Sequence, residues 1–170
     1  MKIFLNFLLI IVLSFFGCNK GLAPLSPDEM QKPGFSGEIT FEGNWPQGIT
    51  RTHIIVFINP INSAGDFNLN NLAYISYEIP YGVKEFVYNT AVDSSYIPIG
   101  SGEYSYVVVA QSSTANVSFN RTDWTVAGVY YAAGDTTNPG KLNIPPNTLV
   151  RNINIICNFN SPPPQPPGGK

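Results

Sequence analysis

The chain has 170 residues, of which 9 are basic and 11 acidic, giving a net charge of −2. This weak negative balance and the lack of any basic cluster exclude a protein that binds nucleic acid by neutralising phosphates. Charged residues make up only 12% of the chain and aromatic residues 13%. A surface that is polar rather than ionic is typical of extracytoplasmic β proteins.

The N-terminal segment has the layout of a secretory signal peptide. Lys2 is followed by an apolar run over residues 7–13 and by the small residues Ser14 and Gly17. A transmembrane helix is the alternative, but at about 1.5 Å per residue a helix over 3–17 would span only roughly 22 Å. The hydrocarbon core is roughly 30 Å thick, so we expect a helical signal peptide over residues 1–17.

The sequence Phe15-Phe16-Gly17-Cys18 resembles the lipobox of bacterial lipoproteins, although Phe15 and Phe16 replace the usual Leu and small residue. The resemblance implies cleavage between Gly17 and Cys18, a diacylglyceryl group on the Cys18 thiol and an acyl chain such as palmitate on the new amino terminus. Two or more acyl chains anchor a protein stably. We therefore expect a lipid-anchored protein of the cell envelope, on the outer membrane, with the bilayer as its partner. The alternative is a signal peptide that is cleaved at another site, in which case Cys18 has no role in lipid attachment.

Three further regions follow the signal. Residues 18–34 contain three prolines and no periodic pattern, which indicates a lipidated, flexible tether. Residues 35–160 carry the pattern of a single β domain. Residues 161–170 read SPPPQPPGGK; because proline lacks the N–H that a sheet requires, we expect an extended or disordered tail, and a proline-rich ligand is the alternative.

The β pattern consists of short runs separated by Gly, Pro, Asn and Asp. Strands are expected at 37–43, 53–59, 72–79, 85–89, 95–99, 103–111, 124–131, 141–144 and 149–159. In the first of these runs Ile39 and Phe41 should face inward, and the second is apolar on both faces, as in a central strand. Cys157 is in phase with apolar neighbours and should be a buried, unpaired thiol.

Alternation over 124–131 predicts Trp124, Val126 and Tyr130 on one face of that strand, and Thr125, Val129 and Tyr131 on the other. Short strands joined by turns predict an all-β fold, a single antiparallel Greek-key sandwich of seven to eight strands.

The runs at 37–43, 102–110, 126–131 and 150–155, together with Pro139, resemble bacterial carboxypeptidase-regulatory or transthyretin-like domains. This resemblance implies the same sandwich, used for scaffolding or binding.

The candidates for chemistry are few. His53 is the single histidine and lies at the start of an apolar strand without a nucleophile motif, so a strand-edge histidine is favoured over a catalytic base. One histidine and one free cysteine cannot form a typical zinc site. Asp66, Asn68 and Asn70 resemble the opening of a calcium loop but lack its glycine and final acid, which favours an ordinary polar loop. The sequence therefore predicts no catalytic residue, metal or cofactor.

Aromatic side chains are the remaining hint of a binding site. Trp45, Trp124 and Tyr131 are the candidate ligand-binding residues, because exposed rings can stack on sugars; core packing is the alternative. The sequence favours a non-enzymatic lipoprotein that binds or scaffolds, with envelope proteins or glycans as partners. Carbohydrate binding is the first alternative, and a hydrolase accessory or weak hydrolase the second.

Overall fold

A computed structural model describes residues 31–169. The signal segment, the cleavage site at Gly17 and the lipidation site at Cys18 lie outside the described residues. Within the described range the domain is all-β, as the sequence predicts, and contains two 3-10 turns but no α-helix. No helix in this range is long and apolar enough to cross a membrane.

The strands follow the predicted runs closely. Their bounds are β1 (Gly34–Glu42), β2 (Arg51–Phe57), β3 (Leu72–Ser76), β4 (Glu85–Asn89), β5 (Ser95–Ile97), β6 (Gly102–Tyr104), β7 (Tyr106–Ser112), β8 (Trp124–Val129), β9 (Leu142–Ile144), β10 (Leu149–Val150) and β11 (Ile155–Asn158). The 3-10 turns are η3 (Ala64–Asp66) and η4 (Arg121–Asp123). The runs at 103–111 and 149–159 are each divided into two strands, and β1 begins at Gly34, the last residue of the expected tether.

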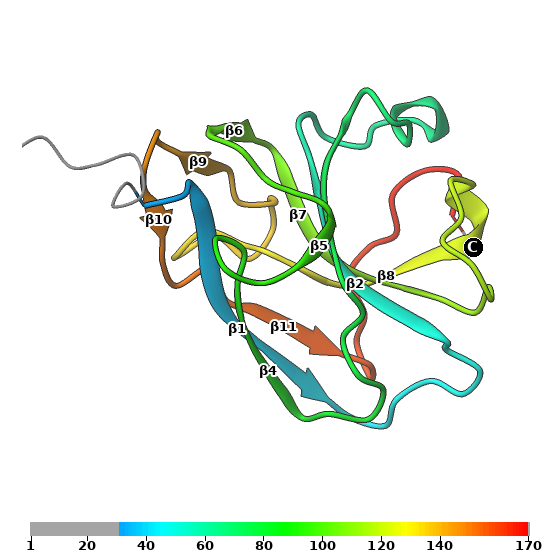
Figure 1. Cartoon of the computed structure of the whole chain (residues 1–170). Helices are drawn as coiled ribbons and strands as arrows, with labels where there is room; N and C mark the ends of the chain where they lie inside the picture. The colour runs from blue at the N-terminus through cyan, green and yellow to red at the C-terminus, as the bar shows by residue number, and fades with distance from the viewer. Residues whose placement is uncertain (1–30, 170) are drawn as a thin grey trace, which may run out of the picture. The chain divides into compact units, whose positions relative to one another are not determined.

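Nine strands form one mixed sheet in the order β10-β1-β11-β8-β7-β2-β3-β5, with β4 paired to the other edge of β1. The sheet curls into a half-barrel, and β6 and β9 form a separate two-stranded sheet (Figure 1). β1 pairs in parallel with both β10 and β11. The expectation of a wholly antiparallel arrangement is therefore wrong, because the chain returns to β1 from a distant part of the sequence rather than through a hairpin.

A bulge in β8 changes which side chains share a face. β7 residues Val109 and Ala110 pair with Gly128 and Val126, so Ala127 is an extra residue in β8. As a result Tyr131 packs on the same core as Trp124, and Tyr130 packs on the opposite core. The predicted alternation is thus wrong beyond Val126, because an inserted residue shifts the two-residue period by one.

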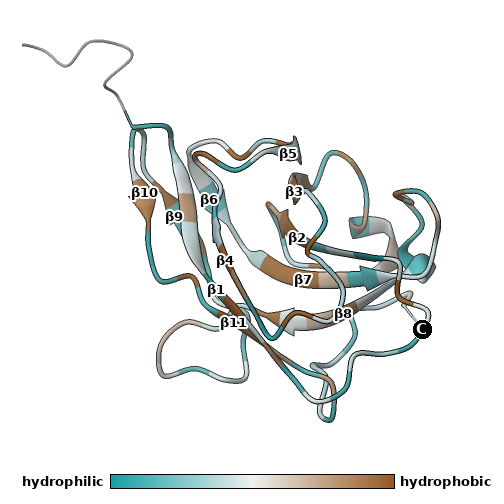
Figure 2. Cartoon of the chain, turned by 60° about the horizontal axis from the view of Figure 1, so that its bottom comes forward, coloured by the Kyte–Doolittle hydropathy of each residue, from teal (hydrophilic) through white to brown (hydrophobic). Residues whose placement is uncertain are grey.

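Each face of the sheet has its own core. The first core lies inside the curl and includes Ile39, Phe41 and Cys157, as predicted. The second core lies on the outer face and includes Ile55, Phe57 and Trp124. Strand β2 therefore has both faces buried, as predicted for the run at 53–59, because Ile54 and Val56 belong to the first core. Figure 2 shows the apolar residues along β2 and β7.

The proline-rich segment lies against β8. The Gln165 side chain forms two hydrogen bonds with the backbone of Val126, and the carbonyl of Pro166 accepts a bond from Arg121. The sequence predicts an extended or disordered tail, and in the structure residues 161–169 are extended and docked on the domain. The one glutamine among these prolines supplies the N–H donor that the prolines lack, together with a side-chain acceptor.

Candidate functional site

A small apolar hollow opens on the outer face of the sheet. Its cavity volume is about 20 Å³, enough for about one water molecule, and it opens to solvent. We call this cavity the outer hollow. The residues that line it are Ile55, Phe57, Phe67, Asn68, Leu72, Ile75, Phe119 and Trp124. The floor comes from β2, β3 and the first residue of β8. Phe67 and Asn68 belong to the loop between β2 and β3, and Phe119 belongs to the loop between β7 and β8.

A row of aromatic rings connects the outer hollow to the edge of the sheet. Tyr77 and Tyr96 pack together with ring centroids 4.8 Å apart, and about half of each side chain is exposed. The Tyr96 ring lies 5.8 Å from the His53 ring, and the His53 ring lies 5.8 Å from that of Trp124. Because Trp124 lines the hollow, the row leads from solvent to the apolar floor.

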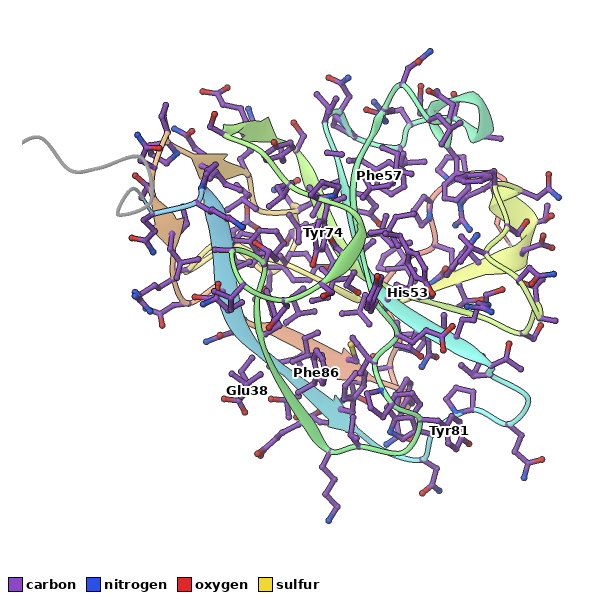
Figure 3. All side chains as sticks on the ribbon, in the orientation of Figure 1. Glu38, His53, Phe57, Tyr74, Tyr81 and Phe86 are labelled. Carbon is purple, nitrogen blue, oxygen red and sulfur yellow. The ribbon has the colours of Figure 1, made fainter. Side chains whose placement is uncertain are left out.

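His53 is buried in this row as a neutral ring (Figure 3). Its Nδ1 lies 3.0 Å from the carbonyl oxygen of Ser76, so Nδ1 carries the proton and donates it to that oxygen. Nε2 is then an acceptor, and it is buried without a partner. Burial lowers the pKa of His53 below its ordinary value. The contact of Nδ1 is with a backbone carbonyl, as expected for a structural histidine.

The three aromatic residues predicted to bind ligand do not come together. Trp124 is only 2% exposed, and its indole N–H donates to the Ser118 carbonyl. Its ring therefore forms part of the buried floor of the hollow. Trp45 is half-buried, and its indole N–H donates to the carbonyl of Val83. Tyr131 is half-buried against the second core. Trp124 and Tyr131 therefore pack on the second core and Trp45 on the first, and the role of these three residues in ligand binding stays a prediction.

Trp45 belongs to a different aromatic cluster. Its ring centroid lies 4.6 Å from Phe41, 5.1 Å from Tyr81 and 5.3 Å from Phe159. Phe41 is buried, whereas Tyr81 is 56% exposed and is seen at the periphery in Figure 3. With its neighbours on several sides, Trp45 closes the end of the first core.

Sequence reasoning missed Phe119 and the β5 edge. Phe119 is 57% exposed beside the hollow, but no periodic pattern marks a loop residue. The contact of Tyr77 with Tyr96 depends on the pairing of β3 with β5, which local sequence does not specify. The exposure of a ring is decided by what covers it, and this is a tertiary property.

Asp66 and Asn68, which in sequence resemble the opening of a calcium-binding loop, form hydrogen bonds within their own loop. The Asp66 carboxylate accepts hydrogen bonds from the backbone N–H groups of Asn62 and Ser63, and these bonds lower its pKa. The side-chain oxygen of Asn68 accepts from the backbone of Asn70 and Asn71. Over residues 31–169 there is no group of three or more His, Cys, Asp or Glu side chains that could hold a metal ion.

Comparisons of the chain with protein-family models, with curated proteins and with solved structures found no match. The features of this chain that bear on function are the lipobox-like sequence and the geometry of the outer face.

Proposed function

We propose that this chain is a lipid-anchored, non-enzymatic protein of the cell envelope that binds an extended segment of a partner protein on the outer face of its sheet. The observation that carries the proposal is the outer hollow with its partly exposed aromatic border. Tyrosine and other aromatic residues are enriched where proteins bind partners, because they bury a large area with few rotatable bonds.

The lining of the hollow favours an apolar side chain. Asn68 is its single polar residue, and the other seven are aliphatic or aromatic. A sugar would need hydrogen-bond partners for its hydroxyl groups, which this lining does not supply. An aliphatic or aromatic side chain needs none, and burying it contributes about 1.5–3 kcal/mol.

The adjacent sheet edge favours an extended segment. β5 is the last strand in the sheet order and pairs only with β3. An edge strand offers backbone N–H and C=O groups to an added strand. Ile75 of β3 lines the hollow and pairs with Ile97 of β5. A segment added at β5 would therefore run close to the hollow and could insert one side chain into it.

The anchor would keep the domain near the membrane surface. In this proposal Cys18 carries the lipid, and residues 18–33 would allow a separation of at most roughly 58 Å between lipid and domain. Such a separation suits a partner that is itself embedded in or bound to the outer membrane.

We propose that the half-barrel is a variant of the Greek-key sandwich of the transthyretin-like class. In support, the Phe35 ring on β1 lies 5.7 Å from the Tyr74 ring on β3. β1 and β3 are distant in the order of the sheet, so this contact across the first core resembles the packing of two layers.

A peptide titration of the full chain tests the proposed function. The probe is acetyl-Thr-Val-Phe-Val-Thr-amide, and the control peptide has Ser in place of Phe. We expect saturable NMR shifts at the methyl groups of Ile55 and Ile75 with the Phe peptide only. Phe119→Ser should weaken binding about tenfold, since a well-buried aromatic contact is worth at least about 1.4 kcal/mol.

Val87→Ser is the matched control, because Val87 is 76% exposed on β4 and does not line the hollow. Equal binding of both peptides, or the same loss in both variants, would refute the proposal. Binding of glycans that depends on Tyr77 and Tyr96 would instead support the carbohydrate alternative, which the partial exposure of these rings favours.

A further inference from the structure

The C-terminal segment is held to the domain by very few groups of its own. The Val126 N–H donates to Gln165 Oε1, and Gln165 Nε2 donates to the Val126 carbonyl, both at 2.8 Å. The Arg121 guanidinium donates to the Pro166 carbonyl at 2.9 Å. One side chain and one carbonyl of the segment therefore make these bonds, so it can detach without breaking a strand ladder.

The end of the segment touches both loops that border the outer hollow. A Cβ built on Gly168 would lie 2.6 Å from the Cβ of Ala64, in the loop that also carries Phe67. A Cβ built on Gly169 would collide with the Arg121 guanidinium, which belongs to the loop that also carries Phe119. Two adjacent glycines thus allow the backbone to approach the two loops closely.

Arg121 joins these contacts to the floor of the hollow. Its side chain is buried, and its guanidinium also donates to the carbonyl of Trp124, whose ring lines the hollow. Burial lowers the pKa of Arg121, because the charged group is removed from water. Detachment of the segment would return water to this charge, which offsets part of the cost of losing the contacts.

We propose that residues 161–169 form a strap that regulates access to the outer hollow. With the strap docked, the β2–β3 and β7–β8 loops are tied together and the hollow stays small. With the strap detached, the loops separate and admit the apolar side chain of the partner. This inference rests on the proposed function, since it concerns the same hollow and the same extended peptide.

Gly168→Ala in the full chain tests the strap. Gly168 has φ +78°, and the new methyl group would collide with Ala64. Gly48→Ala is the matched control, because Gly48 has φ +77° but no atom within 4 Å of the added Cβ. Both variants carry the same backbone strain, and only the first should detach the strap. Gln165→Ala is a second way to detach it.

Two measurements are made on each variant: hydrogen exchange of the Val126 amide, which Gln165 protects, and the affinity for acetyl-Thr-Val-Phe-Val-Thr-amide. We expect faster exchange and an affinity at least about threefold higher in Gly168→Ala and Gln165→Ala, because a larger fraction of molecules has an open hollow. Gly48→Ala should match the unmodified chain in both.

The outcomes separate the two proposals. Faster exchange with unchanged peptide affinity would overturn the strap while the proposed function stands. Unchanged exchange in both strap variants would also overturn it. If no form of the chain binds the peptide, the proposed function fails, and the strap has no regulatory role.

Discussion

The side-chain amide of Gln165 takes the place of a neighbouring strand beside Val126. β11 pairs with β8 only at Val129, so the edge of β8 is uncovered at Val126. Backbone N–H and C=O groups that are partly buried need partners, and the amide provides one donor and one acceptor at 2.8 Å each. This relationship explains how a segment with five prolines can dock on a sheet edge.

Replacement of Gln165 by Ala should lower the free energy of unfolding by about 1–3 kcal/mol, because two hydrogen bonds to partly buried backbone groups are lost. Urea denaturation of the full chain measures the change. Gln47→Ala is the control, since Gln47 is exposed in the loop between β1 and β2. An equal effect of the two substitutions would show that the amide of Gln165 contributes nothing specific.

The stability of the domain should depend on pH through His53. Its pKa is lowered from 6.5 by burial, while Glu78 raises and Arg51 lowers it by smaller effects. The unfolded chain therefore binds a proton more readily than the folded chain, so the contribution of His53 to stability is complete well above pH 6.5 and is lost as the pH falls through 6.5 toward the lowered pKa of the folded state. Asp66 and Asp135 have pKa values lowered from 3.8, so their protonation reduces stability only in more acidic solution.

Urea denaturation at several pH values tests this dependence. His53→Gln keeps a donor for the Ser76 carbonyl but does not titrate, so the decrease between pH 7 and 5 should become smaller. A variant with the same decrease as the unmodified chain would assign the pH dependence to other groups.

Cys157 should be unreactive in the folded domain. Its side chain is completely buried, and burial raises the pKa of the thiol well above its usual range. The thiolate that reacts with reagents is then scarce and inaccessible. Ellman's reagent should modify Cys157 of a Cys18→Ser chain in seconds to minutes in denaturant but only very slowly in its absence. Rapid reaction under native conditions would contradict the buried position.

Substitution of Cys18 by Ser should abolish lipid attachment, because serine lacks the thiol that the diacylglyceryl group requires. Metabolic labelling with palmitate and fractionation of membranes from soluble protein measure the result. We expect loss of label and release of the chain from the membrane fraction. Membrane retention unchanged by the substitution would refute the anchor.

Part of the fold follows directly from the sequence. Local alternation identified the strands, as in the run at 85–89, which coincides with β4, and it assigned Ile39, Phe41 and Cys157 to the interior. Such periodicity shows which side of a strand is apolar and therefore buried. It can be identified from residues that are close together in the sequence. The same reasoning failed beyond Val126, where one extra residue in β8 reversed the pattern.

The tertiary structure alone decided which segments became neighbours. The parallel pairing of β1 with β11, the contact of Tyr77 with Tyr96 and the docking of Gln165 on Val126 all join residues that are far apart in the sequence or in separate strands. Composition and periodicity contain no information on such pairings, because many arrangements bury the same apolar faces. By itself the sequence determined the β strands and the buried thiol; the outer hollow and the docked segment exist only because the sheet curls and brings its loops together.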